Sequence, residues 1–81
     1  MRVVVRLFAG LAEAAGSRTL TLDLPDGATA DAARRAIAGR FPATAAACER
    51  VALAVNAEYA PAEQALREGD EVALIPPVSG G

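Results

Sequence analysis

Hydrophobic and polar residues alternate without interruption over residues 18–24, where three leucines share one face. A repeat of two residues is typical of a β-strand with one buried side, so this segment predicts a strand. Residues 2–9 are rich in β-branched and aromatic side chains and predict another strand. Alternation gives that strand a core face and a less buried face, with Val3, Val5 and Leu7 on the first and Val4, Arg6 and Phe8 on the second.

A helical spacing follows the turn at residues 25–27. Thr29 is a good N-cap, and Asp31 lies in the first turn, where the helix dipole favours an anion. Apolar residues then recur at every fourth position and form one stripe, made of Ala33, Ile37 and Phe41. Pro42 ends this helix.

Two alanine-rich segments have a weaker pattern. Residues 10–16 predict a loop with one helical turn, and residues 44–49 predict a short helix that carries Cys48. A lone cysteine in such a helix is interpreted as a small buried hydrophobic residue, not as a redox or sulfur-shuttling group.

The second half of the chain predicts two or three further strands. Val51, Leu53 and Val55 line one that ends at Asn56, and residues 59–60 form a brief partner strand. Residues 66–70 form a turn in which Gly69 supplies a positive φ, and residues 71–75 form the last strand.

The order strand, strand, helix and two or three strands indicates an α+β domain of two layers. Because the first and last strands are the most apolar, they are expected to lie side by side in the middle of the sheet. This arrangement is the β-grasp, or ubiquitin-like, fold: a mixed sheet of four to five strands with one main helix across one face. The predicted division is a domain over residues 1–75 and a flexible, extended tail over residues 76–81.

Composition narrows the possible functions. The chain has 81 residues, a formal net charge of −2, no histidine and one cysteine. It has no basic run and no long apolar stretch, so binding to nucleic acid or membrane is not expected. A cytoplasmic location is expected. All of its cationic side chains are arginine, so no lysine can accept an isopeptide bond.

The end of the chain is its most distinctive feature, and its sequence is Pro76-Pro77-Val78-Ser79-Gly80-Gly81. The prolines hold the backbone extended, and the glycines have no Cβ, so they can pass through a slot too narrow for other residues. At about 3.3 Å per residue, such a segment reaches roughly 20 Å. The tail is therefore interpreted as a stalk that presents the carboxylate of Gly81.

Residues 66–81 resemble the signature of a known family, the small sulfur-carrier subunit of molybdopterin synthase. Weaker similarities lie at residues 7–9 and 54–56. The resemblance implies that an E1-like adenylating enzyme uses ATP to activate Gly81, which becomes a thiocarboxylate and donates sulfur to a pterin precursor. It implies a sulfur donor such as a cysteine desulfurase or rhodanese, and a heterotetramer with the large catalytic synthase subunit.

The resemblance also assigns partner-binding residues. It places Phe8, Tyr59 and Ile75 against the large subunit or the activating enzyme, while Gly80 and the rest of the tail thread the partner's active site. Two positions depart from the family pattern, because Tyr59 carries a hydroxyl where an aliphatic residue is common and Ile75 replaces an aromatic residue.

No catalytic group is evident in the chain itself. Without histidine the usual proton shuttle near neutral pH is missing, so no enzymatic activity of its own, no bound cofactor and no metal site are expected. Arg34 and Arg35 are interpreted as a solvated helix face. Asp70 and Glu71 are expected to cap a turn and keep a sheet edge soluble.

Two other functions remain open. Sulfur carriers for the thiazole of thiamine or for tRNA thiolation share the fold and the terminal glycines, although the Pro-Pro-Val-Ser sequence favours molybdopterin synthesis. A ubiquitin-like modifier that is conjugated to lysines of other proteins shares the activation step.

Overall fold

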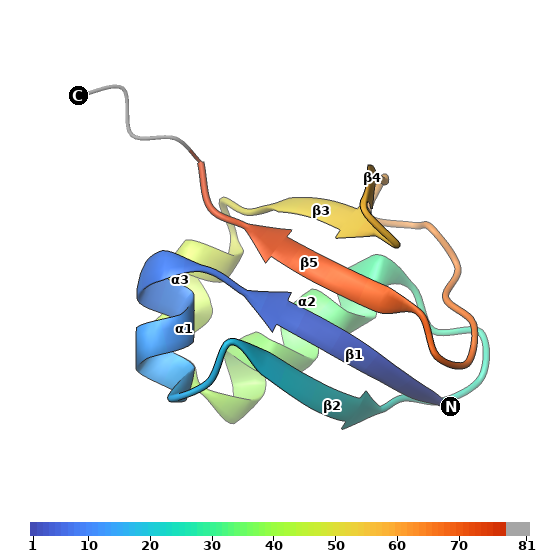
Figure 1. Cartoon of the computed structure of the whole chain (residues 1–81), viewed down its shortest axis with the longest axis horizontal. Coiled ribbons are helices and arrows are strands. Elements are labelled where there is room, and N and C mark those ends of the chain that lie inside the picture. Colours follow the sequence, from blue (N-terminus) through green and yellow to red (C-terminus); the bar gives the residue numbers. More distant parts are fainter. Residues whose placement is uncertain (78–81) are drawn as a thin grey trace.

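Five strands form one mixed sheet in the order β2-β1-β5-β3-β4 (Figure 1). The computed structural model describes residues 1–77. The strands are β1 (Arg2–Leu7), β2 (Thr19–Asp23), β3 (Ala52–Val55), β4 (Glu58–Tyr59) and β5 (Glu71–Ile75). β1 pairs in parallel with β5 and antiparallel with β2, and β3 pairs antiparallel with both β5 and β4. The first and last strands are therefore neighbours at the centre of the sheet, as predicted.

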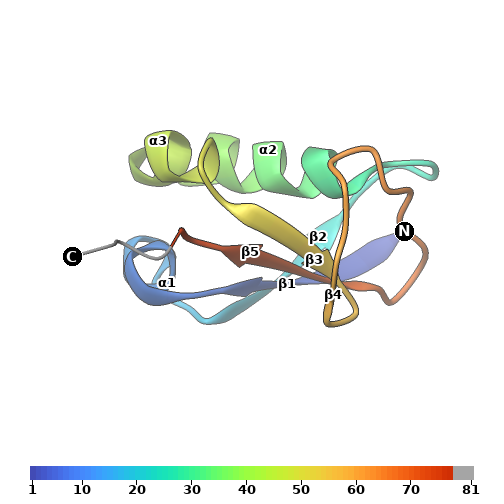
Figure 2. The same ribbon diagram turned by 90° about the horizontal axis from the view of Figure 1, so that it is seen from above.

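The helices are α1 (Ala9–Ala15), α2 (Ala30–Arg40) and α3 (Ala45–Cys48), and a 3-10 turn, η1 (Pro42–Thr44), joins the last two. α2 and α3 lie over one face of the sheet, whereas the opposite face is free of them (Figure 2). The predicted cap is confirmed, since the Thr29 hydroxyl accepts a hydrogen bond of 3.3 Å from the amide of Ala32.

The core lies between the sheet and α2. Ile37 of α2 is fully buried, and it shares one cluster with the inward residues of the two central strands, Val3, Val5, Leu7, Val72 and Leu74. The alternation predicted for residues 2–9 is confirmed, because Val4 is only partly buried and Arg6 is exposed. The chain thus has the α+β, β-grasp architecture expected from its sequence.

Residues 9–15 correct one prediction, because they form the helix α1 where a loop with one turn was expected. Gly16 ends α1 in the left-handed region, with φ 76°, and its amide donates to the carbonyl oxygens of Ala12 and Glu13. Leu11 anchors the helix in the core and is 3% exposed. With a single large apolar residue, the segment carried too little periodicity to identify a helix.

Two charged residues also differ from expectation. Arg34 is not on a solvated face, since its side chain is only 23% exposed and donates to Asp31 at 2.6 Å and to the carbonyl oxygen of Cys48 at 3.2 Å. Arg35 is exposed as predicted. Glu71 does not lie at a sheet edge, because β5 lies between β1 and β3.

Candidate functional site

Phe8, Tyr59 and Ile75 line one shallow depression of about 260 Å³ on the face of the sheet opposite α2 and α3. Phe8 follows β1 directly, Tyr59 belongs to β4 and Ile75 ends β5. Residues far apart in the sequence meet here because the parallel pairing of β1 with β5 aligns the ends of those two strands. We call these three residues the open-face patch.

The floor of this depression is made of small side chains. Ala73 of β5 pairs with Ala54 of β3, and Ala54 pairs with Tyr59 of β4. Because alanine methyl groups rise little above the sheet, the large rings beside them stay exposed to solvent. Phe8 is 42% and Tyr59 78% exposed, and they are the exposed large hydrophobic residues of the part that the structure describes.

One ion pair borders the open-face patch. The Arg6 guanidinium lies 3.7 Å from the Glu71 carboxylate, and both side chains are about half exposed. Such a surface pair contributes little to stability, on the order of 0 to 1 kcal/mol. It leaves a mixed charge at the rim of an apolar surface, which is the usual arrangement at a protein interface.

Turns that contain non-glycine residues in the left-handed region position Phe8 and Tyr59 of the open-face patch. Ala9 has φ 48° and turns the chain from β1 into α1 immediately after Phe8. Asn56 and Ala57 have φ 50° and 70°, which is the pattern of a type I′ hairpin turn between β3 and β4. That turn places Tyr59 opposite Ala54. Non-glycine residues with positive φ cluster at functional sites.

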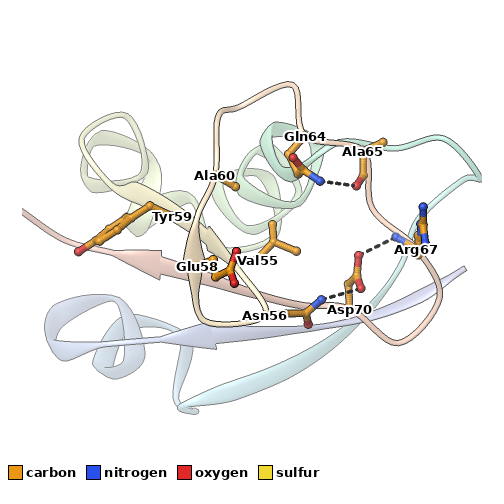
Figure 3. Close-up of a pocket in the computed structure, with 9 residues that line it drawn as sticks. All are labelled: Val55, Asn56, Glu58, Tyr59, Ala60, Gln64, Ala65, Arg67 and Asp70. Atoms are coloured by element: carbon orange, nitrogen blue, oxygen red, sulfur yellow. Dashed lines mark hydrogen bonds between the residues drawn. The ribbon is translucent and has the colours of Figure 1, made fainter.

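A polar pocket of about 520 Å³ lies on the other side of the β3–β4 hairpin (Figure 3). Asn56 crosses its base, donating to the Asp70 carboxylate at 3.0 Å and accepting from the Glu71 amide at 3.0 Å. The second Asp70 oxygen accepts from the Arg67 amide at 2.8 Å. Tyr59 lies apart from this cluster in Figure 3. These hydrogen bonds therefore connect the β3–β4 turn to the start of β5.

The hydrogen bond from Asn56 is the main reason that the pKa of Asp70 lies below its ordinary value. The bond from the Arg67 amide and the charge of the Arg67 side chain lower this pKa further. Asp70 therefore caps the turn that enters β5, as the sequence predicted, and no group of three or more His, Cys, Asp or Glu side chains that could hold a metal occurs in residues 1–77. None of the helices in this range is long and apolar enough to cross a membrane.

The remaining predicted site residues lie at the end of β5. Pro76 and Pro77 follow Ile75 and line a second groove with α3. Val78, Ser79, Gly80 and Gly81 lie outside the described residues. The structure thus brings Phe8, Tyr59 and Ile75 together next to the point where the tail begins.

The residue pattern alone does not predict this grouping. The exposed face of the first strand was predicted, but Ala54, Ala73 and the Arg6–Glu71 pair were not. Alternation in all three strands could have placed Ala54 and Ala73 on that face. Their position beside Phe8 depends on the strand order, which short-range patterns do not give.

Comparison with known proteins identifies the family of the chain. The model of the ThiS family matches residues 5–81. The chain belongs to the ThiS family. The match includes β5, the two prolines and both terminal glycines.

Curated relatives of this ThiS family protein carry two kinds of name. Small archaeal modifier protein 1 of Haloferax volcanii is 40% identical, and the alignment covers 94% of this chain and 97% of the relative. The molybdopterin synthase sulfur carrier subunit of Chlamydomonas reinhardtii is 39% identical over the whole of both chains.

The similar solved structures carry the same two kinds of name. The crystal structure of small archaeal modifier protein 1 from Haloferax volcanii superimposes with a TM-score of 0.87 at 38% identity and covers all of both chains. A complex of subunits 1 and 2 of the molybdopterin-converting factor from Helicobacter pylori contains a chain that matches with a TM-score of 0.70 at 26% identity.

Proposed function

We propose that this protein is a sulfur carrier and the small subunit of molybdopterin synthase. Gly81 is adenylated, converted to a thiocarboxylate and used to donate sulfur to a pterin precursor. The observation that carries this proposal is the position of the open-face patch beside the start of the tail. A partner that binds Phe8, Tyr59 and Ile75 is in place to receive the residues that follow Ile75.

The chemistry requires activation because a carboxylate is a poor electrophile. Attack of a Gly81 carboxylate oxygen on the α-phosphate of ATP forms a mixed anhydride with AMP and releases pyrophosphate. A sulfur nucleophile then displaces AMP, which is a good leaving group. This chain supplies the carboxylate and its position, and the partner enzymes supply the catalytic groups.

Three partners follow from this assignment. An E1-like enzyme binds ATP and adenylates Gly81, a cysteine desulfurase or rhodanese supplies sulfur, and the large synthase subunit uses the product. The complex of the two converting-factor subunits from Helicobacter pylori supports the last of these. The expected assembly is a heterotetramer of two small and two large subunits in the cytoplasm, and the small subunit binds no cofactor or metal.

The open-face patch is suited to binding these partners. Tyr59 and Phe8 are large, exposed and close together, which is typical of residues that dominate the binding energy of an interface. The alanines between them leave room for side chains of a partner.

A second function is favoured by one observation. The 40% identical relative from Haloferax volcanii is named a small archaeal modifier protein. The same activated Gly81 can be transferred to a lysine amine of another protein in place of sulfur. A carrier for thiamine or tRNA thiolation is a third candidate, with the same activation step.

Intact-mass spectrometry tests the proposal. The protein is incubated with ATP, the activating enzyme and a sulfur source, and a thiocarboxylate adds about 16 Da, the difference between sulfur and oxygen. A matched variant lacking Gly81 should show no gain. Sulfur transfer to a pterin precursor in the presence of the large subunit then separates molybdopterin synthesis from the other carriers.

The modifier function gives a different result. It predicts covalent adducts of higher mass that survive thiol reagents and depend on Gly81. An unchanged mass under conditions that thiolate a related carrier would contradict the carrier function.

A further inference from the structure

A groove of about 380 Å³ lies on the helix side of the point where β5 ends. Its walls are Ala46 and Ala47 of α3, the side chain of Arg50, and the rings of Pro76 and Pro77. The open-face patch lies on the opposite face of the sheet. Ile75, the last residue of β5, lines the patch, whereas the two prolines that follow it, Pro76 and Pro77, both line this groove.

The α3 wall of the groove is firmly held. Cys48 at the end of α3 is fully buried, and Thr44, which directly precedes α3, is 1% exposed, so both ends of α3 are anchored in the core. Arg34 of α2 donates to the carbonyl oxygen of Cys48 at 3.2 Å, and the same guanidinium is fixed by Asp31 at 2.6 Å. The exposed residues of α3 are the alanines at positions 45–47, whose methyl groups are small, so the groove stays open.

The rim of the groove carries a positive charge. Arg50 is exposed, and it enters no ion pair with any residue in the range 1–77. An apolar floor with one available cation at its edge fits a segment that has an apolar side chain next to a carboxylate.

We propose that this groove is a docking site for a loop of the protein that receives the tail. An apolar side chain of the loop lies on Ala46 and Ala47, and a carboxylate pairs with Arg50. The site rests on the proposed carrier function, and it is continuous with the proposed interface because adjacent residues, Ile75 and Pro76, belong to the two surfaces. The partner therefore contacts the chain on both sides of the point where the tail begins.

Two variants test the groove by different means. Ala47→Phe fills it, and Arg50→Glu reverses its charge. Arg67→Glu is the matched control, because it makes the same charge change at an exposed position before the opposite end of β5. Both groove positions are exposed, so the melting temperatures of the two groove variants should stay close to that of the wild type. Arg67→Glu should melt slightly lower, because it loses a favourable charge beside Asp70.

The measurement is the affinity of each full-length variant for the large molybdopterin synthase subunit of the same organism, by titration calorimetry. Each groove variant should bind about tenfold more weakly than the wild type, and the control within about twofold. Added salt should weaken binding of the wild type more than that of Arg50→Glu, because an ion pair is screened.

Wild-type affinity in both groove variants would overturn the docking site while leaving the carrier function intact, provided that the wild type binds the subunit and gains the sulfur mass. Failure of the wild type in both assays would remove the carrier function and the docking site with it. Loss of self-association by Arg50→Glu, with partner affinity unchanged, would show that a second copy of this chain occupies the groove.

Discussion

Replacing Asn56 should destabilise the fold in two separable steps, because this residue has two roles. Its side chain makes two hydrogen bonds, to the carboxylate of Asp70 and from the amide of Glu71, each at 3.0 Å. Its backbone has φ 50°, a conformation that asparagine tolerates and alanine disfavours. Asn56→Gly removes only the hydrogen bonds, whereas Asn56→Ala removes them and adds backbone strain.

The expected magnitudes follow from these contacts. A hydrogen bond contributes about 0.5 to 1.5 kcal/mol, and exposure places these two at the low end because water can replace them. Asn56→Gly should therefore lower the free energy of unfolding by about 1 to 2 kcal/mol. Alanine in the left-handed region costs about 1 kcal/mol more. The predicted order of stability is wild type, then Asn56→Gly, then Asn56→Ala.

Urea denaturation at neutral pH measures this order, and its pH dependence tests the link to Asp70. The pKa of Asp70 is lowered in the folded protein, so its carboxylate stabilises the fold above its ordinary pKa of 3.8. This stabilisation is lost as the pH falls from that value through the lower pKa of the folded state. The loss should be smaller in Asn56→Gly. Equal stability of wild type and Asn56→Gly, or a more stable Asn56→Ala than Asn56→Gly, would refute the reasoning.

Three further outcomes are expected. Phe8→Ala should weaken binding to the large subunit at least about tenfold while lowering the melting temperature by only a few degrees. Calorimetry measures the affinity and thermal melts measure the stability. A large loss of stability with little loss of affinity would place Phe8 in the core. Ala57→Gly should raise the free energy of unfolding by about 0.5 to 1 kcal/mol in urea, because glycine adopts φ 70° without strain. Cys48→Ser should keep the gain of sulfur mass, since Cys48 is fully buried, and loss of that gain in a folded variant would contradict a structural role.

Most of the fold was predictable because its strongest signals are local. The alternation in β1 and β2, the Thr29 cap and the apolar stripe of the helix that stops before Pro42 each depend on neighbouring residues, and the structure confirms them. α1 was missed because Leu11 is its single large apolar residue and leaves no helical periodicity to recognise. Arg34 was misassigned because its partner, the carbonyl oxygen of Cys48, lies 14 residues further along the chain.

The open-face patch could not be derived from local patterns. Resemblance to the family pointed to Phe8, Tyr59 and Ile75, but only the strand order shows that they share one depression. Phe8 and Ile75 depend on the parallel pairing of β1 with β5, and Tyr59 depends on a two-residue turn that contains Ala57 in place of the glycine favoured there.

This topology also explains how the fold can serve the proposed reaction. β5 is bonded on both sides, to β1 and to β3, and its start is tied by Asn56 to the β3–β4 turn. The tail therefore begins from one of the two central strands of the sheet, whereas a tail on β4 would begin from a two-residue strand at the edge. A fixed origin lets a partner that recognises the surfaces around Ile75 also determine where the last glycine arrives. In the proposed function, the fold thus contributes position, and the partner enzymes contribute the chemistry.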